Sequence, residues 1–375
     1  MAPSSSPNGY YTFTSESVCE GHPDKVCDYI ADSILDAHLA QDPHSHVACE
    51  ALCKSNFIVL AGEITSDAKV DCAAVAREAV REIGYCDPRE PFCADTVFIQ
   101  QLITKQAQEI AAGVGCATDV EGEQGAGDQG IMFGFATDET PELMPLPITL
   151  AHRLARRLAE DRKSGEASWL RPDGKTQVSL LYQGNRPIAV SNVLIAAQHR
   201  DEVSEAKVRE YVRESLLPRA LGDWHNPQIN LLVNPAGSFV HGGPSADCGV
   251  TGRKIIVDTY GGMAPHGGGA FSGKDPSKVD RSAAYFCRYV ARQAVKAGLA
   301  SKVQIQVAYA IGCAQCISVR VDTFGTGDER EVEDFVRSFD FRPRAMIERL
   351  DLLRPIYRQT TNYGHFGKAN LPWEQ

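Results

Sequence analysis

The feature that most constrains the fold of this chain is an order of helical and extended patterns that recurs along it. Apolar residues spaced for one face of a helix predict a helix that begins after Pro23, a residue suited to the first helical position. Two extended runs follow at 47–53 and 57–64, then a helical pattern over 70–83 and an extended run at 96–103. The first order is therefore helix, strand, strand, helix, strand.

The same order returns twice. The second copy comprises 148–163, 177–182, 188–197, 203–217 and 229–233, and the third comprises 279–296, 303–308, 317–321 and a helical segment from 329. Helices that cover one face of an amphipathic sheet leave its other face to be buried elsewhere. The pattern predicts three related α/β domains, although helix–strand alternation is also common in any long α/β chain.

Composition excludes several classes of protein. Of the 375 residues, 43% are hydrophobic and 23% charged, which is typical of folded domains and not of disordered chains. The formal net charge of -10 argues against a general nucleic-acid-binding protein. No apolar run approaches a membrane span, and residues 1–9 resemble a mobile tail more than a signal peptide. A cytosolic protein with reduced cysteines is expected.

Three segments combine glycine with charged residues. Gly-His-Pro-Asp-Lys at 21–25 leads into the first helix, where backbone amides attract anions, although on these residues alone a capped helix start is the better explanation. Gly-Ala-Gly-Asp-Gln-Gly at 125–130 is weaker, because such stretches are usually turns. Gly-Gly-Gly-Ala-Phe-Ser-Gly-Lys at 267–274 is the strongest candidate for a polyphosphate site. Asp275 stands where a phosphate-loop NTPase has Ser or Thr, which argues against that class.

Basic residues next to these segments suggest one anion-binding cleft. Each basic site alone could be an ordinary charged turn. If their side chains come together, they form a cationic pocket in an acidic protein. The residues concerned are Lys175, Arg253, Lys254, Lys274 and Lys278. That contrast indicates a small polyanionic substrate.

The three glycine-containing motifs closely resemble those of the S-adenosylmethionine synthetases, or methionine adenosyltransferases, and the similarity runs from about Phe13 to Trp373. The resemblance implies three domains related by a pseudo-threefold axis, each a sheet covered by helices, hence an α+β fold. The expected boundaries are a tail at 1–10, an N-terminal domain at 11–122 with a mobile active-site loop at 104–122, a central domain at 123–240 and a C-terminal domain at 241–375. An exchange of terminal segments between domains is left open.

The resemblance also implies an activity: sulfur of L-methionine attacks the 5′ carbon of ATP, and the displaced triphosphate is hydrolysed to phosphate and pyrophosphate. It implies two Mg²⁺ ions per site and one K⁺ per subunit, a homodimer with shared sites or a dimer of dimers, and neither nucleic acid nor membrane as a partner. Attack by a thioether needs no general base, so the lack of a catalytic triad does not count against this activity.

Site roles follow from the resemblance, position by position. The catalytic residues would be His22, Lys175, Arg253, Lys254, Lys274 and Lys278. The ATP contacts would be His22, Asp173, Lys175, Ser238, Phe239, Asp247, Arg253, Lys254, Ala270 and Lys274. The methionine contacts would be Glu63, Gln106, Asp128, Asp247 and Lys278, and the metal ligands Asp24 and Asp280 for Mg²⁺ and Glu50 for K⁺.

Two positions depart from the family pattern, His241 and Pro265, and both are expected to alter pocket shape or loop mobility and not the chemistry. Two other functions remain open on the residues. A magnesium-dependent kinase or ligase would fit the basic glycine-rich segments, and a noncatalytic partner subunit would keep the fold and the nucleotide.

Overall fold

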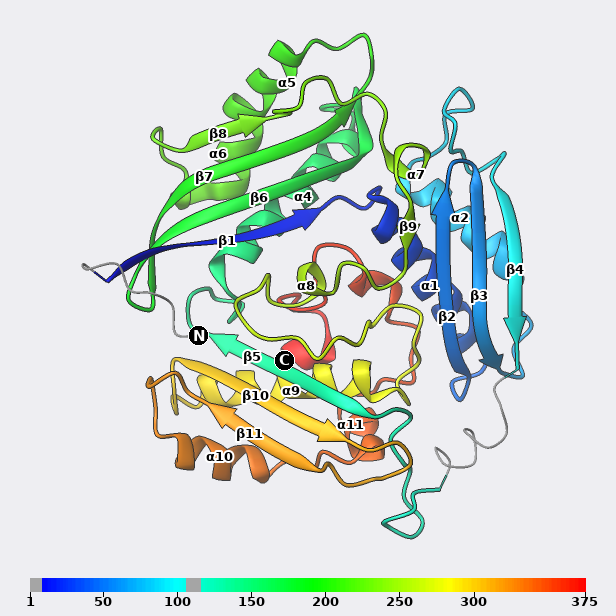
Figure 1. Ribbon diagram of the computed structural model, residues 1–375, viewed down its shortest axis with the longest axis vertical. Helices are drawn as coiled ribbons and strands as arrows, with labels where there is room; N and C mark the ends of the chain where they lie inside the picture. Colours follow the sequence, from blue (N-terminus) through cyan, green and yellow to red (C-terminus); the bar gives the residue numbers. More distant parts are fainter. Residues whose placement is uncertain (1–8, 106–115) are drawn as a thin grey trace.

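The computed structural model describes residues 9–105 and 116–375, and three sheets dominate it (Figure 1). The first has the order β4-β3-β2-β9, the second β1-β6-β7-β8 and the third β11-β10-β5. Helices pack on one face of each sheet, with α1 on β2, α4 on β6 and α9 on β5 and β10. This confirms the predicted three regions of sheet and covering helices.

The first unit along the chain contains two helices and three strands of its own. These are α1 (Pro23–Leu39), β2 (His46–Lys54), β3 (Phe57–Thr65), α2 (Cys72–Ile83) and β4 (Phe98–Thr104). The second unit has α4 (Leu146–Ser164), β6 (Leu170–Gln183), β7 (Arg186–His199), α5 (Glu205–Tyr211), α6 (Leu217–Leu221) and β8 (Asn230–Val233). A π-helical turn, Val212–Leu216, joins α5 to α6.

The third unit differs at its end. It has α9 (Val279–Lys296), β10 (Lys302–Tyr309), β11 (Ser318–Asp322), α10 (Glu329–Arg337) and α11 (Pro343–Leu350). In the first two units the last strand pairs parallel with its neighbour, β4 with β3 and β8 with β7. In the third, α11 follows α10, and the sheet within the described residues has three strands.

Each sheet is completed by a strand from outside its own unit. These strands are β1 (Tyr10–Val18), β5 (Gly130–Thr137) and β9 (Gly249–Val250), and the short helices α7 (Gly243–Ala246) and α8 (Ile255–Asp258) flank β9. The strand β1 precedes the first unit but pairs with β6 of the second unit. The strand β5 precedes the second unit but pairs with β10 of the third, and β9 precedes the third unit but pairs with β2 of the first. All three pairings are antiparallel, so the exchange is cyclic and ties the three units together.

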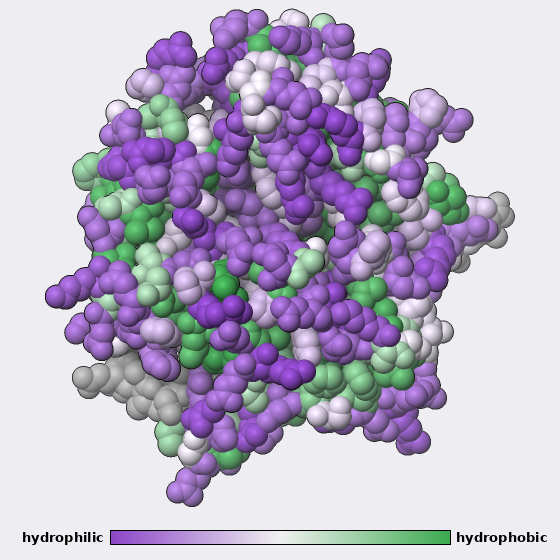
Figure 2. Space-filling view, turned by 180° about the vertical axis from the view of Figure 1, so that it is seen from behind, coloured by the Kyte–Doolittle hydropathy of each residue, from purple (hydrophilic) through white to green (hydrophobic). Residues whose placement is uncertain are grey.

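Polar and apolar side chains are unevenly distributed over the surface. The face turned away from the viewer of Figure 1 is mostly hydrophilic with small hydrophobic patches (Figure 2). On the first sheet, the side away from the helices exposes apolar residues instead: Leu52, Phe57, Phe98 and Leu102, of which Phe98 and Leu102 are more than half exposed, at 58% and 56%. Phe57 and Phe98 stack with ring centroids 4.9 Å apart. A continuous apolar strip therefore crosses this sheet.

Among the described residues, no helix combines the length and apolar character that crossing a membrane would require. The cysteines are free thiols, and Cys313 and Cys316 lie between β10 and β11.

Candidate active site

The site is built around the N-terminus of α1, where His22 is the capping residue. Its extended backbone (φ -60°, ψ 135°) places the imidazole over the first turn, and its Nδ1 accepts the backbone N–H of Asp24 at 3.2 Å. The ring proton therefore lies on Nε2. Burial, followed by the charges of Lys254 and Lys175, lowers the pKa of His22 to about 3. The imidazole is neutral near pH 7 and offers one N–H donor to the site.

Asp24, in the first turn of α1, binds the segment that carries the predicted phosphate ligands Arg253 and Lys254. Its Oδ2 lies 2.6 Å from Nζ of Lys254, and its Oδ1 accepts the N–H of Val250 at 3.0 Å and lies 3.7 Å from Nη1 of Arg253. Burial opposes ionisation, but the hydrogen bonds from Lys254 and Val250 together with the charge of Lys254 outweigh it, so the pKa of Asp24 is lowered. This carboxylate is ionised and already paired.

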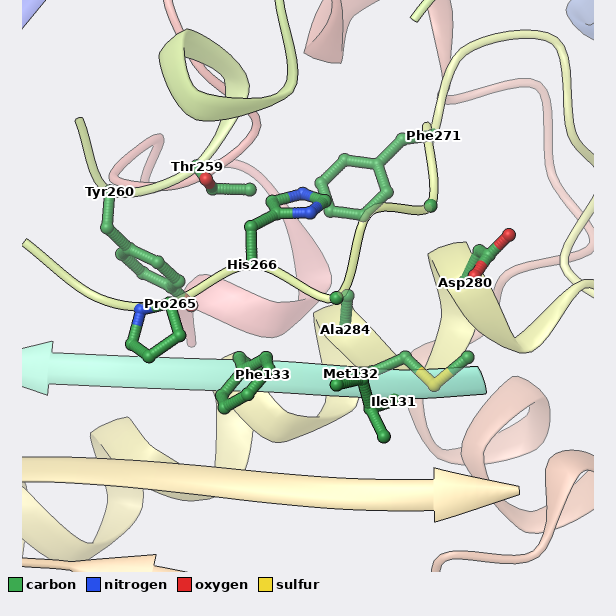
Figure 3. A pocket seen from close by; sticks show the side chains of 12 residues that line it. Ile131, Met132, Phe133, Thr259, Tyr260, Pro265, His266, Phe271, Asp280 and Ala284 are labelled. Carbon is green, nitrogen blue, oxygen red and sulfur yellow. The ribbon is translucent and has the colours of Figure 1, made fainter. Parts of the chain in front are cut away.

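A second charged pair lies on the glycine-rich segment. Nζ of Lys274 lies 2.5 Å from Oδ2 of Asp280, in the first turn of α9. Gly269 lies so close to Asp280 that a Cβ there would fall 2.1 Å from its Oδ1, so only glycine fits. Figure 3 shows the pocket beneath this segment, where His266 and Phe271 lie above β5 and Asp280 stands at the start of α9.

Two contacts join the glycine-rich segment to the rest of the site. Lys274 forms an antiparallel bridge with Ala48 of β2, and the N–H of Cys49 donates to Gly273 at 2.9 Å. A Cβ added at Gly252 would fall 2.5 Å from that of Ala270, so the segment before Arg253 touches the glycine-rich segment directly. The two segments that carry these cations therefore lie side by side and border one region.

Asp173 and Lys175 enter the same region from β6. Asp173 is buried, its Oδ2 accepts the N–H of Gly243 at 2.8 Å, and its Oδ1 has no hydrogen-bond partner among the described residues. Burial raises its pKa to about 6. An unpartnered buried oxygen is costly unless a ligand satisfies it, which fits the predicted nucleotide contact. Lys175 is exposed on the same strand.

Gln198 connects Asp173 to the predicted adenine contacts. Its Oε1 accepts the N–H of Asp173 at 3.3 Å, and its Nε2 donates to the carbonyl of Val240 at 2.9 Å. The exposed Ser238 and the half-buried Phe239 come just before Val240. Sequence reasoning missed Gln198, because an isolated glutamine carries no motif.

The predicted methionine contacts surround the glycine-rich segment less tightly. Glu63 is exposed on β3 opposite Ala48, which bridges Lys274. Asp128 follows Gly127, whose N–H donates to Ser277 at 3.1 Å. Asp247, exposed after α7, acts on the pKa of His22. Gln106 and most of the loop predicted at 104–122 lie outside the described residues.

Lys278 does not present a free ammonium group. Its Nζ lies 2.5 Å from Oδ2 of the buried Asp275, and only 10% of its side chain is exposed. The two departures, His241 and Pro265, are both exposed, and Pro265 lines the pocket of Figure 3.

The residues present suit metal ions held together with a substrate. Among the described side chains, no group of three His, Cys, Asp or Glu converges on a common point. Asp24 and Asp280 are single carboxylates, and Mg²⁺ is commonly held by one or two carboxylates together with substrate phosphates. Burial raises the pKa of Glu50 on β2 to about 7, and a bound monovalent cation would favour its ionised form. The donor set therefore fits Mg²⁺ and K⁺.

The fold of three cyclically joined units, with lysine and arginine side chains paired to Asp24 and Asp280, is compatible with an enzyme that binds a phosphorylated substrate. The family models of S-adenosylmethionine synthetase match the chain in three parts: the N-terminal domain at 10–108, the central domain at 123–239 and the C-terminal domain at 241–375. The chain belongs to the S-adenosylmethionine synthetase family.

Relatives named S-adenosylmethionine synthase resemble the chain over nearly its whole length. The protein of Akkermansia muciniphila is 56% identical over 98% of this chain and 96% of its own. That of Thermus thermophilus is 53% identical over 96% and 95%, and that of Sorangium cellulosum 54% over 97% and 87%.

The first prediction concerns the protonation of His22. Because burial disfavours the charged imidazole, His22 should stay neutral from pH 8 down to pH 5, whereas an ordinary histidine titrates near pH 6.5. NMR of ring-labelled histidine, with His22→Asn to assign its signal and free N-acetylhistidine amide measured in parallel as the control, measures this directly. A His22 signal that titrates together with the free imidazole would contradict the structure.

Proposed function

We propose that this chain is an S-adenosylmethionine synthetase that converts ATP, L-methionine and water to S-adenosylmethionine, phosphate and pyrophosphate. The observation that carries the proposal is a set of charged pairs in a member of this family: Arg253 and Lys254 pair with Asp24 at the N-terminus of α1, and Lys274 pairs with Asp280 at the start of α9. A cation cluster in an acidic protein suits a triphosphate.

The reaction needs alignment and charge neutralisation more than proton transfer. The methionine sulfur donates its lone pair to the 5′ carbon, the bond from that carbon to the 5′ oxygen breaks, and its electrons stay on the triphosphate. The sulfur becomes a sulfonium without losing a proton. Cations placed at the leaving triphosphate stabilise the charge that grows there, and water then cleaves the triphosphate in the same pocket.

The residues divide this work between them. Lys175, Arg253, Lys254 and Lys274 bind the phosphates, and neutral His22 donates its Nε2 proton in a hydrogen bond close to the breaking bond. Asp173, Ala270, Ser238, Phe239 and Asp247 contact the nucleotide, and Glu63, Gln106, Asp128, Asp247 and Lys278 surround methionine. For Lys278 to do so, its ammonium must turn from Asp275.

Asp24 and Asp280 would hold two Mg²⁺ ions, and Glu50 one K⁺. Bound Mg²⁺ supplies charge neutralisation at the phosphate oxygens. In the structure Lys254 and Lys274 pair with the same two carboxylates. Binding of Mg²⁺ and triphosphate would release both lysines from the two aspartates. The two ammonium groups could then bind the phosphates.

We also propose that two copies of the chain associate through the uncovered face of the first sheet. In the register of β3 and β4, Ala61 pairs with Leu102 and Phe57 pairs with Phe98, so these four side chains lie on one face of the sheet. The buried Ile58 and Leu60 lie on the opposite face. Glu63 lies on the same face by its alternation with Ala61. A partner that covers the apolar strip would also close the site around this carboxylate. A dimer of dimers and a cytoplasmic location stay predictions from the sequence.

The second prediction tests the reaction. With ATP, methionine, Mg²⁺ and K⁺, chromatography of products from labelled methionine should show a sulfonium nucleoside with equal amounts of phosphate and pyrophosphate. Omitting methionine is the control for ATP hydrolysis alone. A kinase would release ADP, a ligase would release AMP or an adenylate, and a noncatalytic subunit would leave ATP intact, so each of these results would contradict the proposal.

The third prediction tests the association. Leu102→Glu places a charge in the proposed interface and should give monomers without synthetase activity at micromolar concentration, as measured by sedimentation. Ala74→Glu, on exposed α2 behind the same sheet, is the matched control and should stay dimeric and active. A Leu102→Glu protein that remains dimeric, or an active monomer, would show that this face is not the interface.

A further inference from the structure

Four aspartates recur at every fourth residue of α1 and form a stripe along it: Asp24, Asp28, Asp32 and Asp36. Residues four apart lie on one face of a helix. Asp28 and Asp32 are completely buried, and each of the four carboxylates accepts a backbone N–H from the second half of the chain. The stripe therefore fastens distant segments to one helix.

The second carboxylate of the stripe holds the segment that leads into Arg253 and Lys254. Oδ1 of Asp28 accepts the N–H of Gly252 at 2.8 Å, one turn beyond the bond from Val250 to Asp24. Asp28 itself is shielded from the site, so it acts on the substrate only through this segment.

The third carboxylate holds the segment that leads into Lys274. Oδ1 of Asp32 accepts the N–H of Gly273 at 2.8 Å and pairs with Nη1 of the buried Arg281 at 2.7 Å. That guanidinium also donates to the carbonyls of Phe271 and Lys274, at 2.9 and 3.1 Å. The glycine-rich segment is thus tied to α1 one turn away from Gly252.

The helix consequently fixes the distance between the two cationic segments. Four residues of an α-helix rise about 6 Å, and this spacing does not depend on any flexible loop. The buried charge of Asp28 is compensated, because Nζ of Lys25 lies 3.1 Å from its Oδ2 and 2.6 Å from Oδ1 of Asp258. Asp28 can therefore lose its charge without leaving Lys25 unpaired.

We propose that Asp28 is a positioning residue for the reaction: through its hydrogen bond to Gly252 it holds Arg253 and Lys254 at the separation from Lys274 that the triphosphate requires. The inference rests on the proposed function, because it assumes that these three cations bind the triphosphate. The hydrogen bond, and not the charge of Asp28, carries the effect.

Asp36 provides a matched control on the same stripe. Its carboxylate accepts the N–H groups of Tyr357 and Arg358, at 2.9 and 2.8 Å, and that segment carries none of the predicted substrate contacts. Asp36→Ala removes the same kind of anchor from the same helix. It should lower the melting temperature but leave kcat within about threefold of wild type.

The fourth prediction is that Asp28→Ala lowers kcat for S-adenosylmethionine formation by about 10- to 100-fold, because small displacements of positioned groups cost that much. Asp28→Asn should restore kcat to within about threefold, since the amide oxygen still accepts the N–H of Gly252 and Lys25 can turn from the amide NH2 group toward Asp258. If Asp28→Ala does not fold, Asp28→Glu replaces it in the test. This variant keeps the negative charge but displaces the oxygen that accepts the N–H of Gly252. Its kcat should fall, whereas Asp28→Asn should stay active.

Steady-state kinetics and melting temperatures of the four variants test whether Asp28 positions the cationic segment. Equal kcat for Asp28→Ala and Asp36→Ala, or a loss in Asp28→Asn as large as in Asp28→Ala or Asp28→Glu, would overturn the inference. A wild-type protein that forms no S-adenosylmethionine would instead refute the proposed function.

Discussion

The structure depends on one buried helix whose carboxylates are compensated by cations and amides from elsewhere in the chain. Asp32 of α1 pairs with Arg281 of α9, both without exposed surface, and Asp28 shares Lys25 with Asp258. Removing one partner from a buried pair is costly, commonly about 3–5 kcal/mol, because the other charge is left without compensation. These pairs therefore impose one arrangement of the first and third units, and the site lies where they meet.

The same electrostatics prepare the site for a polyanion. Asp24 and Asp280 each pair with one lysine, which holds these cations in place and offsets their charge. A triphosphate with its metal ions would take over both sets of partners. Preorganised charges of this kind stabilise a transition state without reorganising during the reaction. The neutral His22 adds a directional donor and no further positive charge.

The sequence predicted the periodic elements well, because long amphipathic helices such as α1, α4 and α9 carry strong local signals. It did not predict β1 and β5, which lie outside the repeated order and pair with strands of another unit. The charged residues of the site came from motifs and a resemblance, and the structure brings Asp24, Arg253 and Lys254 together. Asp28 and Asp32 were missed although their four-residue spacing is visible, since buried positioning groups resemble ordinary polar residues until their partners are known.

The most direct test of the central claim is the fate of the oxygen that bridges the 5′ carbon and the α-phosphorus of ATP. ATP labelled with ¹⁸O at that bridging position would be incubated with methionine and the protein, and the products separated and analysed by mass spectrometry. Sulfur attack on carbon predicts that all of the label leaves with the phosphate products and none stays in the nucleoside. Label retained on the 5′ carbon of the nucleoside product would mean that a phosphorus–oxygen bond had broken instead, and would contradict the account.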